Sequence, residues 1–449
     1  MSRRRFGSFA QVCALFLCGL PIVTRLGHLS TVIPQFNYPQ VQTFIPPILN
    51  PLDTSVNRTI CPAINDTRYS HLRPVEPDSG NKRKYVFSVS LQQCIDLLPS
   101  VLGPLIEVIR FLGPWNCAIS IISRNSTDGT LEVLRLLAAE LERLDVGYWL
   151  TSTNLDPNAG SDEERIRKLA LLRTIALEPI TGQHTELNDN NDGHRKPFPN
   201  HSRPATTIHR LSSPTPSNIS LTPDATLISL TTVAICAEDI LELIHQRAHQ
   251  SADMVCAMDW WFPSPQHDHD HAHFSSLWSS RALNGDLLAK IFFPSSPDYL
   301  KEKEAEQQQP DLVLANHPAS RARLQANLPF QVFACHSGLA AYAAQPLADH
   351  RVGFRGPRDG ECFQGETQLF CKDMWRTGFG RIAVVPSVNV GCSSGGHLRV
   401  GGGGGDGGRV KRVKGFEGRI VWQEEPPERV VCMPGFGDQT WLAWDEGLG

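Results

Sequence analysis

Three features that would assign a class of function are missing from this sequence of 449 residues. It contains 12 cysteines but no CxxC pair, which argues against a zinc module. Lys and Arg total 42 against 46 Asp and Glu, so the net charge is -4 and no global basic field indicates a nucleic-acid partner. No internal repeat is visible. A small neutral or anionic ligand fits this charge balance as well as a protein partner does.

The composition is that of a folded protein. Hydrophobic residues make up 41% of the chain and charged residues 20%, so the chain can bury a sizeable core and is not disordered as a whole. Its length alone suggests one large domain or two modest ones.

The N-terminus carries an uncharged run, residues 6–23, which follows Arg3, Arg4 and Arg5 and is bounded by Arg25. A helix of this length just crosses a bilayer, and the preceding arginines favour a cytoplasmic tail at residues 1–5 with a luminal remainder. We therefore expect a transmembrane signal anchor. A cleaved signal peptide is the close alternative, and an N-terminus that is apolar by chance is a third. The first two both place the body of the protein in the lumen.

Sequons and cysteines agree with a luminal location. Ten cysteines lie outside the apolar run and can pair in an oxidising lumen, although their pairing cannot be deduced from their spacing. Five Asn-x-Ser/Thr sequons offer sites for N-glycans, at Asn57, Asn65, Asn125, Asn200 and Asn218.

The rest of the chain divides into a stem, a domain and a tail. Residues 24–83 are rich in Pro and polar residues and predict a luminal stem. Residues 84–400 form the predicted catalytic domain, interrupted at 183–223 by a Pro, Ser, Thr, Asn and His-rich stretch that predicts a disordered surface insertion. A Gly-rich loop and a C-terminal segment make up residues 401–449.

Strand and helix patterns alternate within residues 84–400, which predicts an α/β fold. Ligands of such sheets bind at the carboxyl ends of parallel strands, so acids and turn residues at strand ends are typical of a nucleotide-sugar site. Many unrelated folds share that pattern. The expected strands are 85–91, 117–122, 226–236, 254–258, 330–334 and 382–385, and the expected helices are 97–111, 131–144, 161–177 and 237–247.

Two blocks near the end of the domain are more specific. GECFQGETQLFCKDMW at 360–375, followed by GRIAVVPSVNV at 380–390, resembles the C-terminal signature of the fungal capsule-associated α-1,3-mannosyltransferase family. The resemblance implies a type II, Golgi-type enzyme with a GT-A-like luminal fold. It also implies transfer of mannose from GDP-mannose to a mannosylated glycan or polysaccharide, assisted by Mn²⁺ or Mg²⁺, which would neutralise the departing diphosphate.

The sequence departs from the family pattern at strand ends. Where the family usually has an Asn-Asp pair, which is its expected metal-binding pair, this chain has Thr231 and Thr232, and a hydroxyl is a poor substitute for a carboxylate on a hard cation. The acid usual before the STDGT-like turn is also missing, because Ser123 and Arg124 stand there. Thr174 replaces the Asn usual after Arg173.

The remaining acids supply the candidate catalytic residues. Asp259 ends a predicted strand, where it can hold a metal ion or contact an acceptor sugar, or merely cap the next turn. Glu366 lies in the most specific block, where it can orient an acceptor hydroxyl or accept its proton, or be a surface acid near a helix start.

Four further residues are candidates for binding the donor. Arg165 and Arg173 lie eight residues apart on one side of a predicted helix and can clamp a diphosphate, although Arg165 can also pair with Asp162. Asp128 can contact the nucleotide or cap the following helix. Arg281 lies in the block SRALNGD, which also resembles the family.

The sequence therefore favours a mannosyltransferase acting on a cell-surface or capsule-type glycan. A second hypothesis is a non-catalytic luminal protein that binds glycan or assists polysaccharide assembly or export. Loss of the Asn-Asp pair favours the second hypothesis, and retention of the C-terminal blocks favours the enzyme.

Overall fold

The computed structural model describes most of the predicted domain and parts of its flanks. The described residues are 41–53, 55–56, 61–74, 82–185, 206–211, 219–231, 235–261, 273–274, 276, 278–289, 313–314, 316–336, 338–391, 418–435 and 438–448. The predicted anchor at 6–23 lies outside these ranges, and so does Thr232. Within the described ranges, no helix is both long and apolar enough to cross a membrane.

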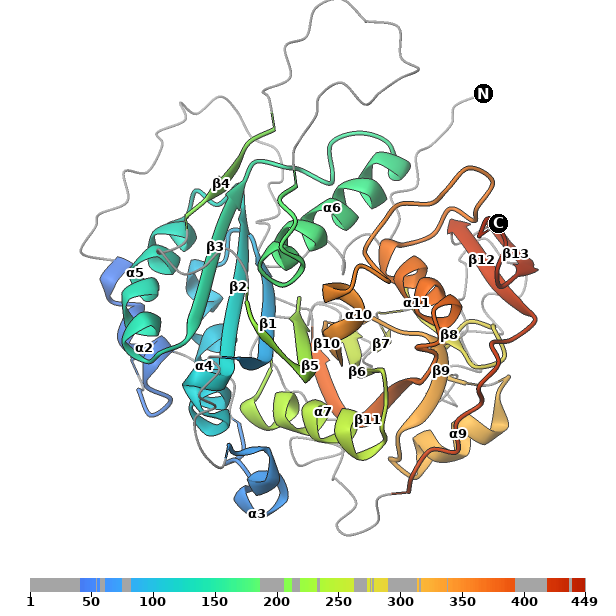
Figure 1. Ribbon diagram of the computed structural model, residues 1–449, viewed down its shortest axis with the longest axis horizontal. Helices are drawn as coiled ribbons and strands as arrows, with labels where there is room; N and C mark the ends of the chain where they lie inside the picture. The colour runs from blue at the N-terminus through green and yellow to red at the C-terminus, as the bar shows by residue number, and fades with distance from the viewer. Residues whose placement is uncertain are drawn as a thin grey trace, which may run out of the picture.

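One large mixed sheet forms the centre of the molecule (Figure 1). Its order is β4-β3-β2-β1-β5-β10-β6-β11-β9-β8, with β7 paired to β6, and a separate hairpin joins β12 and β13. Strands β3, β2, β1 and β5 run parallel, β10 is antiparallel to both β5 and β6, and β11 is parallel to β6. The strand bounds are β1 Arg83–Leu91, β2 Cys117–Arg124, β3 Gly147–Thr153, β4 Ile208–Arg210, β5 Leu221–Leu230, β6 Met254–Trp261, β7 His273–Phe274, β8 Arg281–Ala282, β9 Phe330–Ala334, β10 Leu339–Ala343, β11 Ile382–Gly391, β12 Arg429–Gly435 and β13 Asp438–Ala443.

Helices cover the two faces of this sheet and bury two main hydrophobic clusters. Side chains of α2, α4, α5 and α7 pack on one face, and those of α6, α10 and α11 contribute to the cluster on the other. The helix bounds are α2 Ile45–Leu49, α3 Asp66–Tyr69, α4 Leu98–Leu112, α5 Thr130–Arg143, α6 Asp162–Thr181, α7 Ala237–His249, α9 Pro318–Gln325, α10 Gln345–Ala348 and α11 Glu366–Arg376, with 3-10 turns η2 Ser70–Leu72, η3 Ile95–Leu97 and η4 Pro114–Asn116. This three-layer arrangement confirms the α/β prediction.

Local sequence explains the main elements. All eight residues of β2 are buried, as expected for a parallel strand covered on both faces. At the start of α6, the Ser161 hydroxyl accepts from the Glu164 N–H while the Glu164 carboxylate accepts from the Ser161 N–H. This capping box fixes where α6 begins.

Part of the expected stem is packed against the domain. Ile48 on α2 and Tyr69 on α3 are fully buried, and a disulfide joins Cys61 to Cys236 at the start of α7. The Tyr69 hydroxyl donates to the Glu242 carboxylate, which also accepts a hydrogen bond from the Arg68 guanidinium. The stem prediction for 24–83 is therefore wrong for these residues, because their apolar side chains are spaced too irregularly to show a period in the sequence.

Part of the expected insertion is also ordered. Within 183–223, β4 pairs antiparallel with β3, and β5 begins at Leu221. Arg210 on β4 reaches back to Glu178 on α6, with its Nε 2.7 Å from a carboxylate oxygen. The prediction of disorder is wrong at these positions, because pairing with a distant strand supplies the order that the local composition does not.

The C-terminal segment is part of the same structure. A disulfide joins Cys432 on β12 to Cys362, and Val431 donates its N–H to the Gly285 carbonyl. Figure 1 shows the β12–β13 hairpin beside β8 and α11. Residues 418–435 and 438–448 thus belong to the domain, whereas the sequence predicted that the domain ends at residue 400.

A buried charge network joins this segment to α11. The Glu361 side chain is fully buried and accepts hydrogen bonds from Arg355, from Lys372 at 2.9 Å and from the Arg358 N–H at 2.9 Å. Burial alone would raise the pKa of Glu361, but these donors outweigh it and lower that pKa to about 2. Lys372 also donates to the Glu446 main-chain carbonyl at 2.5 Å.

We expect Glu361→Gln to lower the free energy of unfolding by about 3 kcal/mol at neutral pH, because it leaves buried Lys372 and partly buried Arg355 with one counter-charge fewer. The folded-state pKa lies below the ordinary one of 4.5. The contribution is therefore present above pH 4.5 and is lost as the pH falls toward about 2. Thermal unfolding at pH 7 and at about pH 3.5 measures both effects. A gap between wild type and variant that does not shrink in acid would contradict this account, and Glu163→Gln in an exposed ion pair serves as the control.

Candidate active site

The carboxyl ends of β5 and β6 meet at one point on the sheet edge. The main-chain N–H of Thr231, just after β5, donates to the Gly338 carbonyl at 2.8 Å. The Gly338 N–H in turn donates to an Asp259 carboxylate oxygen near the end of β6 at 3.2 Å. The residue preceding β10 therefore links the ends of both parallel strands.

Asp259 is held within this edge and is 8% exposed. The same carboxylate oxygen, Oδ2, accepts from the Ser276 hydroxyl at 3.4 Å. The Ser279 hydroxyl, nearby in sequence, donates to the carbonyls of Ser276 and His336. Residues 276–279 thus connect Asp259 to the segment that carries His336.

Asp259 provides one carboxylate for a divalent cation. Across the described part of the chain, no three His, Cys, Asp or Glu side chains converge into a metal-binding group. Mg²⁺ in phosphate sites is commonly held by one or two carboxylates together with substrate phosphates and water, and Asp259 fits that mode. It does not fit a site built from protein ligands alone.

Glu366 lies at the first position of α11, on the other side of the same segment. Its carboxylate is 7% exposed and accepts from the Arg173 Nε on α6 at 2.8 Å. The Arg173 Nη1 lies 3.4 Å from the His336 Nε2. The Trp278 indole packs so close to Gly365 that a Cβ at that position would lie 2.9 Å from the indole Cδ1. Only glycine therefore fits directly before Glu366.

Arg165 lies two turns before Arg173 on α6. Its Nη1 donates to the Asn158 side chain at 2.8 Å. Burial lowers the pKa of Arg165, while the charges of Glu366, Asp162 and Asp156 oppose that shift. Arg165 and Arg173 therefore both interact electrostatically with Glu366, Arg173 through a direct ion pair.

Asp128 lies in the loop between β2 and α5, and both of its carboxylate oxygens accept main-chain hydrogen bonds. Its Oδ1 accepts from the Thr130 N–H at 3.0 Å and its Oδ2 from the Ile95 N–H at 2.9 Å. The Gln93 side-chain oxygen accepts from the N–H groups of Thr127 and Asp128. Asp128 therefore precedes the N-cap of α5, Gly129, and accepts from the first residue of the helix, which is close to the capping role that the sequence allowed. It also joins the two loops that follow β1 and β2.

Arg281 is a correction to the predicted donor site. It is fully buried, and its guanidinium donates to the carbonyls of Val431 at 2.8 Å, Ser280 at 2.7 Å and Trp278 at 3.3 Å. Burial lowers the pKa of Arg281 to about 9. Its charge is enclosed by main-chain carbonyls that fix β12, so it cannot contact a donor directly.

Two residues of the site were not singled out from the sequence. His336 is 5% exposed and stands between Asp259 and Arg173, and Phe354 lies under the Arg173 guanidinium, whose Cζ is 5.3 Å from the ring centroid. His336 falls within a block that resembles the family, FQVFACHSGLAAY. A lone histidine there gave no signal of its own, because its partners come from α6 and from residues 276–279.

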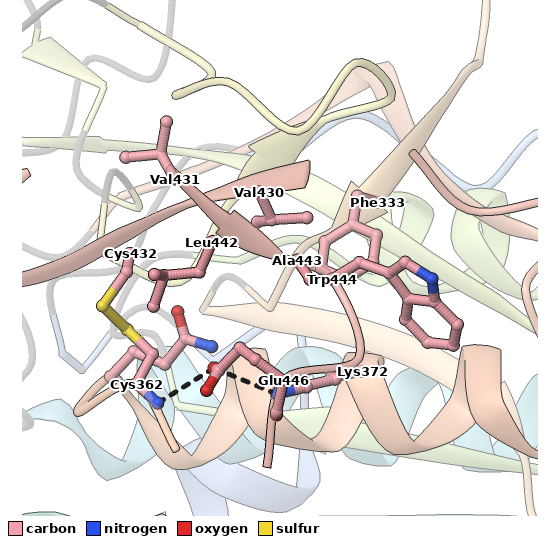
Figure 2. Close-up of a pocket in the computed structure, with 11 residues that line it drawn as sticks. Phe333, Cys362, Lys372, Val430, Val431, Cys432, Leu442, Ala443, Trp444 and Glu446 are labelled. Atoms are coloured by element: carbon pink, nitrogen blue, oxygen red, sulfur yellow. Dashed lines mark hydrogen bonds and ion pairs between the residues drawn. A yellow bond between two sulfur atoms is a disulfide. The ribbon is translucent and has the colours of Figure 1, made fainter. Parts of the chain in front are cut away.

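A small hollow lies elsewhere, between α11 and the C-terminal hairpin. Figure 2 shows Lys372 and Cys362 directed at Glu446, beside the Cys362–Cys432 disulfide and Trp444. Its volume of about 10 Å³ accommodates roughly one water molecule. It cannot hold a sugar nucleotide.

Comparison with known proteins identifies the family of this chain. The family model described as Cryptococcal mannosyltransferase 1 matches residues 84–373, which include Asp259, Arg173, His336 and Glu366. Among curated proteins, Alpha-1,3-mannosyltransferase CMT1 of Cryptococcus neoformans is 27% identical over 403 residues, covering 84% of this chain and 75% of the relative. Because the family model spans more than half of the 449 residues, this chain belongs to the cryptococcal mannosyltransferase 1 family.

Proposed function

We propose that this protein transfers mannose from GDP-mannose, in α-1,3 linkage, to a cell-surface or capsule-type polysaccharide or glycan. Family membership supports the glycosyltransferase class, and the name of the Cryptococcus relative describes an α-1,3-mannosyltransferase. The observation that carries the proposal is that two carboxylates from separate elements are both linked to the segment before β10. Asp259 accepts from the Gly338 N–H, and Glu366 is linked through Arg173 to His336, at the end of the sheet where α/β proteins bind ligands.

The proposed fold type is GT-A-like. The parallel strands β3, β2, β1 and β5, followed by an antiparallel β10 and the parallel pair β6 and β11, support this assignment. Strand order reverses at β1, because β2 and β5 lie on opposite sides of it. In open α/β sheets, nucleotides bind at the carboxyl ends of the strands beside such a reversal.

Each residue of the cluster has a proposed task. Glu366 orients the acceptor hydroxyl and accepts its proton, and Arg165 contacts the donor diphosphate. Asp259 is the carboxylate that would hold Mn²⁺ or Mg²⁺, which when bound would supply positive charge for the departing GDP. Arg173 was expected to share the role of Arg165, but its contacts with Glu366 and His336 favour a different one.

The second candidate is a non-catalytic luminal protein that binds glycan or assists polysaccharide assembly or export. The observation that favours it is that no three His, Cys, Asp or Glu side chains group together among the described residues, and that threonine stands at positions 231 and 232. The two candidates differ in whether GDP binds and whether mannose is transferred.

Donor titration separates them. We expect wild type to bind GDP-mannose weakly and in a Mn²⁺-dependent way, because one carboxylate and a diphosphate provide few ligands for a hard cation. Thr231→Asn with Thr232→Asp should tighten GDP binding in Mn²⁺ by about 10-fold or more, and Asp259→Ala in that background should abolish the gain. Calorimetry with Mn²⁺ and with EDTA measures this. If neither protein binds GDP, the non-catalytic candidate takes the place of the enzyme.

The proposed location is luminal, with residues 1–5 in the cytoplasm and 6–23 as a Golgi or other secretory-pathway anchor. Three disulfides among the described residues, Cys61–Cys236, Cys256–Cys335 and Cys362–Cys432, support an oxidising compartment. They link positions 70 to 175 residues apart in sequence.

Two described sequons should differ in glycosylation. Asn65 is exposed and caps α3 through its Oδ1, which leaves its Nδ2 available for a glycan. Asn125 lies at the sheet edge with a φ of 40°, and its Nδ2 donates to the Asn154 carbonyl at 3.3 Å. We expect glycan at Asn65 and not at Asn125 after expression through a secretory pathway. Peptide mapping of wild type, Asn65→Gln and Asn125→Gln measures it, and a protein without any glycan would contradict the luminal location.

A further inference from the structure

We propose that Arg173 is a positioning residue for Glu366, and that His336 and Phe354 hold Arg173 in the orientation this requires. The inference rests on the proposed function for the role of Glu366 in transfer. It assigns Arg173 to the acceptor side of the reaction, where the sequence alone suggested a donor ligand.

The ion pair fixes the direction of Glu366. A buried carboxylate is costly unless it is paired and hydrogen-bonded. The Arg173 Nε donates to the Glu366 Oε1 at 2.8 Å, and the side chains are only 21% and 7% exposed. Glu366 also opens α11, where the helix dipole attracts a carboxylate. Both interactions hold the Glu366 side chain against one end of the guanidinium.

His336 constrains the other end of the same guanidinium. Arginine has no acceptor, so the 3.4 Å contact between the Arg173 Nη1 and the His336 Nε2 makes His336 the acceptor. Its ring proton is then assigned to Nδ1. The Ser279 hydroxyl donates to the His336 carbonyl at 2.9 Å, which ties this histidine to the residues around Asp259.

Phe354 sets the plane of the guanidinium. The Arg173 Cζ lies 5.3 Å from the Phe354 ring centroid, a cation-π distance. That ring stacks on Phe370 of α11, with centroids 4.5 Å apart, and meets the His336 ring edge-on at 6.1 Å. The planar guanidinium contacts Glu366, His336 and Phe354 at the same time, whereas a lysine ammonium could reproduce only the charge.

These contacts also argue against a primary role in donor binding. The Nε and Nη1 of Arg173 are directed at protein partners, so a diphosphate would have to compete with Glu366 for the same cation. Arg165 has the Asn158 amide as its hydrogen-bond partner instead, which leaves its charge better suited to a phosphate. Arg165 and Arg173 therefore divide between the two substrates.

Steady-state transfer kinetics test the assignment. Arg173→Gln should lower kcat by on the order of 10- to 100-fold, a range typical of a lost supporting contact, and leave the KM for GDP-mannose within about twofold. Arg173→Lys should restore only part of kcat, because it restores charge without the fork. Arg173→Gln combined with Glu366→Gln should be no slower than Glu366→Gln alone.

Matched variants control for general damage to the fold. Arg167→Gln removes an exposed arginine of the same helix, paired with Glu163, and should behave as wild type. His336→Gln keeps an acceptor and should be milder than His336→Leu. If Arg173→Gln raises the KM for GDP-mannose about 10-fold with kcat unchanged, or if its effect multiplies with that of Glu366→Gln, Arg173 is a donor ligand and the assignment is overturned.

A second measurement separates this inference from the proposed function. If wild type transfers no mannose, the proposed function fails, and a double-mutant cycle in thermal unfolding then decides the pairing. Destabilisation by Arg173→Gln and Glu366→Gln should be clearly less than additive, since each removes the same buried contact. Additive effects would overturn the positioning role whether or not the protein is an enzyme.

Discussion

The antiparallel placement of β10 between β5 and β6 is the constraint on which the candidate site depends. Because β10 starts beside the carboxyl ends of its two neighbours, the chain must cross the sheet from the end of β9 within a few residues. The Cys256–Cys335 disulfide pins this crossing to β6. The crossing delivers the His336 ring to Arg173 and the Gly338 main chain to Asp259 and Thr231. The strand order therefore places Gly338 beside Asp259, and places His336 beside the arginine that pairs with Glu366.

Helix α11 forms ion pairs at its first residue and again in its second half. Glu366 at its start pairs with Arg173, while Lys372 and Asp373 further along join Glu361 and Arg355. Buried ion pairs contribute little net stability compared with apolar packing, but breaking one is costly, so they restrict the helix to one position. The Cys362–Cys432 disulfide and the Arg281 guanidinium add the C-terminal hairpin to this set of restraints. The first turn of α11 can then hold a carboxylate steadily without relying on a loop.

The sequence predicted the helices and strands that form from local patterns of apolar residues. The strand at 330–334 matches β9, and the expected helices at 97–111, 131–144 and 237–247 match α4, α5 and α7 within two residues at either end. It also predicted that Asp259 lies near a strand end. It placed the end of β5 too late, at residue 236, because the apolar run in the sequence continues past Leu230, where the strand ends. It could not predict β4, β10 or the C-terminal hairpin, whose order depends on pairing with remote segments. For the same reason it misassigned Arg281, whose carbonyl partners include Val431, 150 residues away.

The strand edge also explains how this family fold tolerates threonine at position 231. Position 231 contributes a main-chain N–H that donates to the Gly338 carbonyl, and any residue other than proline provides that donor. The side chain there is consequently unconstrained by the hydrogen bond that joins β5 to β10. An Asn-Asp pair at positions 231 and 232 is therefore expected to change the affinity for the proposed cation and to leave the positions of Gly338, Asp259 and His336 in place. The hydrogen bonds that shape this edge do not depend on the side chain that the proposed cation site would need.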